Sequence, residues 1–337
     1  MTVVDDRPGS GASGMAAGML APVTEVHYGE EALLRLNIAS SEMYPAFVAE
    51  VEEVSGMKCG YEPSGTLIVA RDSDDNAELD HIHDFQLSLG LKVERLSGTD
   101  CRQLEPALSP RARGGILAPD DHRVDPAALT RALQVACEKT DVAFEHERAV
   151  TVTEGTVATA TGSTFDADAI VIAAGAHSGQ LDVPGVSIPI RPVKGQLVTL
   201  RGAEAPTRHN VRGIDGYIVA RSDGRVVVGA TMEERGFDDT VTAEAVHELL
   251  RAAFELVPGI LELSFVGAVA GLRPVAPDNA PLLGRTHVDG LLLATGHFRN
   301  GVLLAPVTAD AISRILTGEE VDVIAPFAAD RFSGGHS

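Results

Sequence analysis

The chain has 337 residues, which is enough for two domains that each bury a full hydrophobic core. Its 27 Lys and Arg residues against 48 Asp and Glu residues give a formal net charge of −21. A surface this acidic repels phosphate backbones and anionic lipids, and aromatic residues, at 4%, offer few surfaces on which bases could stack. We therefore expect no nucleic-acid partner and no membrane partner.

The cysteines give no sign of a disulfide framework or a metal site. Cys59, Cys101 and Cys137 are odd in number and lack C-x-x-C spacing, so we expect no bound metal. No run of about 18 apolar residues occurs, and Asp5 and Asp6 stand where a secretory signal would be basic or apolar. A reducing, cytoplasmic location fits these features best.

The first half of the chain alternates strand-like and helical patterns. Thr2–Val4 reads as a short β-branched strand that ends at Asp5, and a glycine-rich loop follows from Pro8 to Gly18. Further predicted elements are a helix within 28–56 closed by Gly56, a strand at 66–70, a helix near 80–89, and a helix from Pro126 to Lys139 with Asp125 as its N-cap.

The second half contains two continuous apolar runs that end in small residues. Residues 169–175 and 291–296 have this pattern, which is typical of parallel strands covered on both faces. Other predicted elements are a strand meander at 149–161, a helix at 243–256 behind Thr242, a strand at 264–272, a helix at 307–316 that stops at Gly318, and a frayed carboxyl-terminal tail.

These patterns predict an α/β fold with two interleaved domains. A nucleotide-binding, Rossmann-like body would carry the buried strands, and an antiparallel, α+β second domain would be woven into it. We assign residues 1–38, 124–186 and 268–318 to the first domain, 39–123 and 187–267 to the second, and 319–337 to the tail.

The stretch Gly9–Gly14 matches G-x-G-x-x-G directly after a strand, but its context is wrong for a dinucleotide fingerprint. Such a turn opens a helix and precedes a second strand by about 20 residues, whereas Pro22 interrupts here. We interpret it as a flexible loop. Thr2–Val4 would then be the second strand of the unit, Asp5 would bind an adenosine ribose, and the first strand with its glycine turn would lie upstream of Met1.

Two arginines stand at predicted strand ends. The loop 296–305 follows a buried strand and precedes a helix, so its amides point at whatever lies over the strand ends, and Arg299 there needs an anion unless it caps a carbonyl. Arg273 is held extended by Pro274. It can bind a carboxylate in a bidentate pair, or form a structural ion pair with one of the many acids.

A hairpin places two more side chains. Asp223-Gly224 is a strong signal for a two-residue turn between strands 216–221 and 226–232. With that turn Tyr217 pairs with Ala230, and Tyr217 and Met232 are diagonal neighbours on one face. The pair would line either one wall of a pocket or ordinary core.

Five motifs together carry a family resemblance. They are 16–22 (AAGMLAP), 192–196 (PVKGQ), 228–232 (VGATM), 270–274 (AGLRP) and 296–306 (GHFRNGVLLAP). In this order they closely resemble the glycine oxidases of thiamin biosynthesis, which belong to the D-amino-acid oxidase family of flavoproteins. The resemblance extends over nearly the whole chain.

The resemblance implies an FAD domain and a substrate domain, with the flavin ring at their interface. It makes Arg273 the substrate-carboxylate anchor, Tyr217 a second carboxylate contact, Arg299 a substrate-side contact and Met232 the wall near the α-carbon. No residue acts as acid or base. The implied FAD contacts are Asp5, Ser13, Ala16, Ala17, Gly18, Met19, Ala149 or Val150, His297, Phe298, Arg299, Asn300, Gly301, Val302 and Leu303.

The sequence also departs from the family pattern. It lacks the first strand, glycine turn and helix, about 25 to 30 residues. Related sarcosine oxidases link flavin through a cysteine near 271–274, but no cysteine follows Cys137, so FAD should be non-covalent.

The leading hypothesis is FAD-dependent oxidation of glycine, with sarcosine and small D-amino acids as secondary substrates. The amine would become an imine and then glyoxylate, while O2 is reduced to H2O2. The resemblance also implies a functional link to thiazole synthase and allows a homo-oligomer. The rivals are a D-amino-acid dehydrogenase or oxidase of broader specificity and a flavin-less amino-acid-binding remnant.

Overall fold

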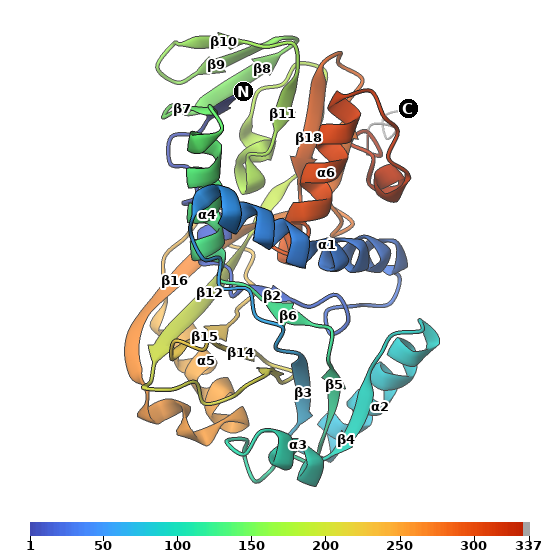
Figure 1. Ribbon diagram of the computed structural model, residues 1–337, viewed down its shortest axis with the longest axis vertical. Coiled ribbons are helices and arrows are strands. Elements are labelled where there is room, and N and C mark those ends of the chain that lie inside the picture. The colour runs from blue at the N-terminus through green and yellow to red at the C-terminus, as the bar shows by residue number, and fades with distance from the viewer. Residues whose placement is uncertain (333–337) are drawn as a thin grey trace.

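The structure is a computed structural model that describes residues 1–332. Two parts lie one above the other in Figure 1, a large sheet below and short parallel strands with covering helices above. The chain crosses between them repeatedly, which confirms the mixed α/β class. Within the described residues no helix is long and apolar enough to cross a lipid bilayer.

The lower part is an eight-stranded sheet. Its neighbours are antiparallel except for one parallel pair, β13 with β3. Across the sheet the order is β16 (Ser264–Val275), β12 (Arg191–Arg201), β15 (Arg225–Gly229), β14 (Tyr217–Ala220), β13 (Asn210–Arg212), β3 (Thr66–Ala70), β5 (Gly114–Ala118) and β4 (Glu94–Ser97).

Helices cover both faces of this sheet. On one face α5 (Ala243–Leu256), η3 (Pro258–Glu262) and α3 (Gly98–Leu104) close the largest apolar core, which includes Val198, Ile218 and Val228. On the other face α2 (Ser73–Ser88) packs over β3 and β5. The rest of that second face, over β12, β14 and β15, is left for the amino-terminal segment.

The upper part contains two parallel strand pairs that are not hydrogen-bonded to each other. They are β1 (Thr2–Val4) with β7 (Ala143–Glu145), and β11 (Ile170–Ile172) with β18 (Leu291–Thr295). The remaining elements are β17 (Leu282–Arg285) beside β18, the meander β8 (Ala149–Thr153), β9 (Thr156–Thr159) and β10 (Thr164–Asp166), η2 (Gly175–Gln180), and the helices α1 (Glu31–Ser55), α4 (Pro126–Lys139) and α6 (Ala305–Leu316). The small pair β2 (Met19–Leu20) and β6 (His122–Arg123) joins the two parts.

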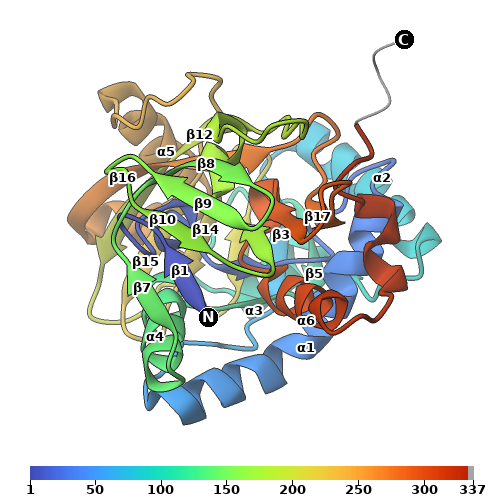
Figure 2. The same ribbon diagram turned by 90° about the horizontal axis from the view of Figure 1, so that it is seen from above.

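The predicted helix ends are confirmed by their capping contacts. The Asp125 carboxylate accepts the amides of Ala127 and Ala128 at the start of α4, and the Thr242 hydroxyl accepts the amide of Ala245 in α5. Gly56 adopts the left-handed conformation that closes α1. Viewed from above, α1 runs beneath both α4 and α6, and it contacts both helices (Figure 2).

Two predicted domain boundaries fall inside single elements. The boundary between 38 and 39 divides α1, which packs as one helix against α4 and α6. The boundary between 267 and 268 divides β16, which pairs with β12 as far as Val275 and so belongs to the large sheet. A domain change within an element leaves no break in its periodicity, so the sequence gives no signal for its position.

Two expectations about exposure are also corrected. Strand β18 is buried on both faces, but in β11 the side chain of Val171 is 37% exposed. The segment predicted as a tail from 319 packs onto the body through η5 (Asp322–Phe327), which buries Ile324 and Phe327. The last part of that predicted tail, 333–337, lies outside the described residues.

Candidate active site

The hairpin β14–β15 sets the position of Tyr217, and its turn differs from the predicted one. Arg221 pairs with Arg225 around a three-residue loop in which Gly224 has a φ of 83°. The extra loop residue shifts the register by one, so Tyr217 lies opposite Gly229 rather than Ala230. Tyr217 and Met232 are therefore not diagonal neighbours, and Met232 follows the end of β15 with 67% of its surface exposed.

Gly195 and Gly229 lie directly beneath the predicted carboxylate contacts, and we call this pair of glycines the floor of the site. A Cβ atom on Gly195 would lie 2.3 Å from Nη1 of Arg273, and one on Gly229 would lie 2.4 Å from the hydroxyl of Tyr217. The guanidinium therefore lies over β12 and the phenol ring over β15, two strands that are neighbours in the sheet. Sheet geometry thus directs both side chains to the same face of the sheet, and their roles as carboxylate contacts stay a prediction.

Arg273 has hydrogen-bonding capacity to spare. Its Nη1 donates to the carbonyl of Thr231 at 3.0 Å and to that of Lys194 at a longer 3.4 Å. Within residues 1–332 no carboxylate lies within ion-pair distance of it, and its Nε and Nη2 groups have no acceptor. These two N–H groups could donate parallel hydrogen bonds to the two oxygens of a ligand carboxylate.

The phenol beside Arg273 remains protonated at any physiological pH. Burial raises the pKa of Tyr217 to about 12, although the nearby charges of Arg273 and Arg212 act in the opposite direction. The hydroxyl can therefore donate a hydrogen bond. A carboxylate placed at the Nε and Nη2 groups of Arg273 could accept that bond as well.

A line of alternating charges continues from this site. Arg212 pairs with Tyr217 in the β13–β14 register, and its guanidinium contacts the carboxylate of Glu25. The other oxygen of Glu25 lies 3.2 Å from Nε of Arg299, whose Nη2 contacts Glu30 at 2.5 Å. Arg299, predicted as a substrate contact, thus already holds two carboxylates of the protein.

Asp121 fixes the segment that carries Glu25. Its carboxylate accepts the amides of Val23 and Thr24, both at 3.0 Å, and the hydroxyl of Thr24 at 2.6 Å. Burial is the main effect on the pKa of Asp121, which it raises to about 7. The backbone that precedes Glu25 is therefore fixed, and the Glu25 side chain contacts Arg212 and Arg299 from this fixed position.

The predicted flavin segment lies on the same sheet face as Tyr217. Ser13 is in a short 3-10 helix, η1 (Ala12–Met15), so the Gly9–Gly14 stretch does not open an α-helix. Ala17 and Met19 pack with Leu197, Val219 and Val227, on the side of the sheet opposite to α5. Only glycine fits at position 18, because a Cβ there would lie 2.0 Å from the carbonyl oxygen of Val124.

A second group of predicted FAD contacts lies in the upper part. Asp5 follows β1, is exposed, and accepts the amide of Arg7 at 2.8 Å. Ala149 begins β8, and the carbonyl of Val150 accepts the amide of Asp182. Ala16 lies between η1 and β2, at the lower group. The predicted contacts therefore lie in two groups, and an extended FAD that reaches both stays a prediction.

The carboxyl-terminal loop presents unpaired donors. Within the described residues the amides of Gly301, Val302 and Leu303 have no acceptor, and the buried Nδ2 of Asn300 has none either. These groups precede the first turn of α6, where the helix dipole favours electronegative atoms. Donors of this kind fit the carbonyl and nitrogen edge of a flavin ring.

Helix α1 holds this loop in place through two side-chain hydrogen bonds. Ser40 Oγ donates to the carbonyl of Leu303 at 2.6 Å, and Tyr44 Oη donates to that of Val302 at 2.9 Å. With both carbonyls held against α1, the amides of the loop are turned away from the helix. Ser40 and Tyr44 were not predicted, because no local sequence pattern links them to a loop about 260 residues away.

His297, which is half-buried, and Phe298, which is buried, complete the loop. Burial lowers the pKa of His297 to about 4, so the imidazole is neutral, and its Nε2 lies 3.0 Å from Oγ1 of Thr308. Phe298 has a φ of 47° and packs with Val193 and Val275 at the end of β16. The loop is thereby joined to the strand that carries Arg273.

The chain is similar to known proteins over nearly its whole length. The FAD dependent oxidoreductase family (DAO) matches residues 1–315. Glycine oxidase from Geobacillus kaustophilus is 33% identical over 97% of this chain and 89% of that protein. Its crystal structure matches with a TM-score of 0.93 at 31% identity, covering 98% of this chain and 91% of that one. The bifunctional protein ThiO/ThiG of Synechocystis is 34% identical over 98% of this chain, which spans 50% of that protein.

Proposed function

The chain belongs to the DAO family of FAD-dependent oxidoreductases, and we propose that it acts as a glycine oxidase. Glycine, O2 and water would yield glyoxylate, ammonia and H2O2. The observation that carries this proposal is Arg273, whose free Nε and Nη2 groups lie beside the Tyr217 hydroxyl over a glycine floor. Such a site would bind one carboxylate.

Binding and orientation are the work of the protein in this reaction. Arg273 and Tyr217 fix the substrate carboxylate, which places the α-carbon and leaves a neutral amine free to become an imine. FAD, when bound, supplies the acceptor for the two electrons and passes them to oxygen. Glycine, sarcosine and small D-amino acids are the proposed substrates. Met232 is exposed and is not a neighbour of Tyr217, so its place beside the α-carbon is proposed from its motif alone.

The residues proposed to hold FAD form the two groups described above. Asp5 would bind the ribose, Ala149 or Val150 the adenine, and Ser13 with 16–19 and 297–303 the flavin side. Non-covalent binding is expected because no cysteine follows Cys137. The unpaired amides of 301–303 and the Asn300 side chain support the flavin assignment.

A role in the thiazole branch of thiamin biosynthesis is part of the proposal. It is supported by the ThiO/ThiG relatives, in which a matching chain is one half of a longer protein. The imine or glyoxylate would then be consumed by a thiazole-forming partner, and titration of the FAD-loaded protein with thiazole synthase in analytical ultracentrifugation tests that contact. The same experiment determines whether the chain forms a homo-oligomer.

Replacement of Arg273 tests the proposed function directly. Arg273→Ala should weaken glycine binding by about 2 to 4 kcal/mol, the usual effect of removing one partner of a buried charge pair. Arg273→Lys should also reduce kcat/KM, because an ammonium group cannot form two parallel hydrogen bonds. The measurement is glyoxylate and H2O2 formed per glycine by the FAD-loaded protein.

The matched control is Arg191→Ala, which removes an exposed arginine from the same part of the sheet. It should leave KM for glycine unchanged. An unchanged KM in Arg273→Ala would contradict the anchor assignment. Imine formation without H2O2 would indicate a dehydrogenase, and a protein that binds glycine but no flavin would indicate a binding remnant.

A further inference from the structure

Glu25 lies between two arginines at the edge of the proposed substrate site. One carboxylate oxygen contacts Arg212, and the other lies 3.2 Å from Nε of Arg299. Only 14% of the Glu25 side chain is exposed. Arg212 is the strand partner of Tyr217, so this ion-pair cluster adjoins the carboxylate site itself.

The charges around the site divide into a balanced group and a free one. Arg212 and Arg299 are neutralised by Glu25 and Glu30, while Arg273 has no carboxylate within ion-pair distance anywhere in residues 1–332. The site as a whole therefore has one positive charge left for a ligand. That is the right number for a substrate with a single carboxylate.

We propose that Glu25 is a specificity-determining residue that excludes substrates with a second carboxylate by occupying Arg212 and Arg299. The inference rests on the proposed function, since it concerns which amines reach Arg273. Glu25 lies close enough to Tyr217 for its charge to raise the pKa of that phenol, so a dicarboxylate bound at Arg273 and Tyr217 would place its second anionic group in the field of the Glu25 carboxylate. Like charges placed together disfavour binding strongly, and this is a common way to reject a wrong partner.

Glu25 cannot easily move aside for such a substrate. Asp121 holds the preceding amides of Val23 and Thr24, and Arg299 donates to the backbone carbonyl of Glu25 at 3.2 Å. Arg212 likewise donates to the carbonyl of Thr24 at 3.2 Å. These backbone contacts would persist without the Glu25 carboxylate. Its removal should therefore leave both arginines in place, Arg212 without a carboxylate partner and Arg299 with Glu30 alone.

The unmodified FAD-loaded protein provides the first test. Sarcosine and iminodiacetate are both N-substituted glycines, and only iminodiacetate carries the additional carboxylate. We expect kcat/KM to be at least about tenfold lower for iminodiacetate than for sarcosine. Equal values would overturn the proposal.

Substitution of Glu25 provides the second test. In Glu25→Gln the ratio of kcat/KM for iminodiacetate to that for sarcosine should rise about tenfold or more, while Glu25→Asp should keep the low ratio. Glu31→Gln is the matched control, because it removes an acid of the same segment that forms no ion pair in the described structure. It should leave the ratio unchanged, and an unchanged ratio in Glu25→Gln would overturn the proposal.

Calorimetric binding distinguishes failure of this inference from failure of the proposed function. Diglycolate and methoxyacetate have the shapes of iminodiacetate and sarcosine but contain no amine to oxidise. Glu25→Gln should bind diglycolate about tenfold more tightly than the unmodified protein and methoxyacetate equally. If that holds while no amine is oxidised, only the proposed function fails. Equal diglycolate affinities in a folded Glu25→Gln variant would overturn the inference alone.

Discussion

At the scale of single residues, the position of Arg273 depends on a neighbour that has no side chain. Its guanidinium occupies the space above Gly195, and the Tyr217 ring occupies the space above Gly229. A methyl group at either glycine would meet these side chains at 2.3 to 2.4 Å, well inside normal contact. The two glycines therefore determine where the charged and phenolic groups can lie.

Gly195→Ala should displace the Arg273 guanidinium. We expect KM for glycine to rise about tenfold or more and the free energy of unfolding to fall by about 1 to 3 kcal/mol, as for other insertions into packed space. The control is Gly267→Ala, since a Cβ at Gly267 in β16 would have no atom within 4 Å. Steady-state kinetics and urea unfolding measure both effects, and a wild-type KM in Gly195→Ala would contradict the floor assignment.

His297 should make stability depend on pH in acid. The imidazole binds a proton near pH 6.5 when unfolded but only near about 4 when folded, because burial disfavours its charged form. The unfolded state thus binds more protons between these values, so stability falls as the pH is lowered from about 6.5 to 4. The contribution should be about 2 to 3 kcal/mol.

Urea unfolding of His297→Gln across this pH range measures that contribution. The variant should show a smaller loss of stability between pH 6.5 and 4 than the unmodified protein. His146→Gln, which removes an exposed imidazole, should show the full loss. An identical pH dependence in His297→Gln would mean that His297 does not resist protonation.

The sequence predicted some of these residues and missed others for a clear reason. Arg273 and Tyr217 stand in motifs whose strand-end and hairpin context can be recognised locally. Glu25 was missed because its partners, Arg212 and Arg299, lie 187 and 274 residues away in the chain. Gly195 was read as part of a motif, since nothing local shows that a distant arginine needs the space above it.

At the scale of elements, helix α1 supports the carboxyl-terminal loop through two of its side chains. Ser40 and Tyr44 lie one turn apart, and each holds a carbonyl of that loop. The helix itself was predictable from its apolar spacing and from Gly56. The hairpin register was not, because an Asp-Gly pair occurs in two-residue turns and also at the end of three-residue loops such as 222–224.

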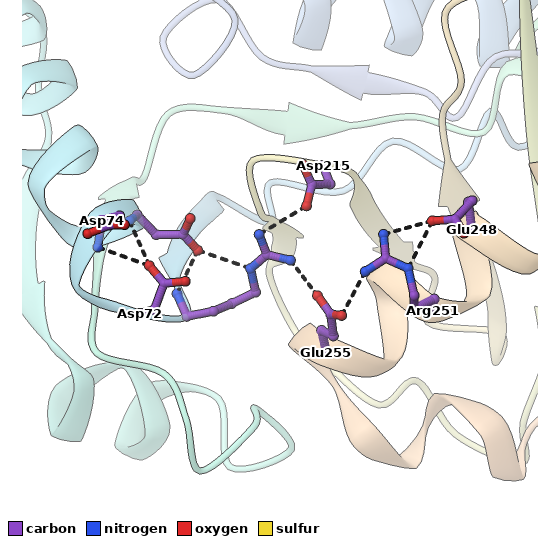
Figure 3. Close-up of polar contacts among 8 residues, drawn as sticks. Asp72, Asp74, Asp215, Glu248, Arg251 and Glu255 are labelled. Carbon is purple, nitrogen blue, oxygen red and sulfur yellow. Dashed lines mark hydrogen bonds and ion pairs between the residues drawn. The ribbon is translucent and has the colours of Figure 1, made fainter.

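Arg71 links α2, α5 and the segment before β14. Figure 3 labels two of the acids that it contacts, Asp215 and Glu255. Arg71 contacts Asp75 in α2 at 3.0 Å, Asp215 before β14 at 3.0 Å, and Glu255 in α5 at 2.5 Å. Arg71→Met should lower the free energy of unfolding by about 1 to 3 kcal/mol, because the nearly buried Asp75 loses its partner.

The neighbouring Arg251 supplies the control for Arg71. It contacts Glu248 and Glu255 in the same network, but its side chain is 44% exposed. Arg251→Met should therefore change stability by no more than about 0.5 kcal/mol. Chemical denaturation of both variants measures the difference, and equal losses would contradict the role of burial.

At the scale of the whole molecule, the two parts are joined by buried polar contacts as well as by the chain. Arg221, at the end of β14, is 5% exposed and donates to the carbonyls of Val124 and Ala17 at 2.9 and 2.8 Å. Val124 lies between β6 and α4, and Ala17 lies just before β2, so both carbonyls belong to segments that lead into the upper part. We expect the parts to unfold together rather than separately.

Arg221→Met should lower the free energy of unfolding by about 2 to 4 kcal/mol, because two buried carbonyls lose hydrogen bonds to a charged donor. Far-UV circular dichroism and tyrosine fluorescence should report the same midpoint in the unmodified protein. Arg201→Met, at an exposed position of β12, should have little effect. Two separate transitions in the unmodified protein would show that the parts are independent.

The three hydrogen bonds to Asp121 bear on how fast the enzyme can turn over. The buried Asp121 carboxylate holds the segment of residues 21–25. If this segment moved away to admit each new substrate, all three hydrogen bonds would have to break. We therefore expect ligand exchange to proceed without motion of this segment. Solvent viscosity should then slow turnover only through diffusion, and Thr24→Val, which removes the shortest of the three bonds, should loosen the segment without speeding product release.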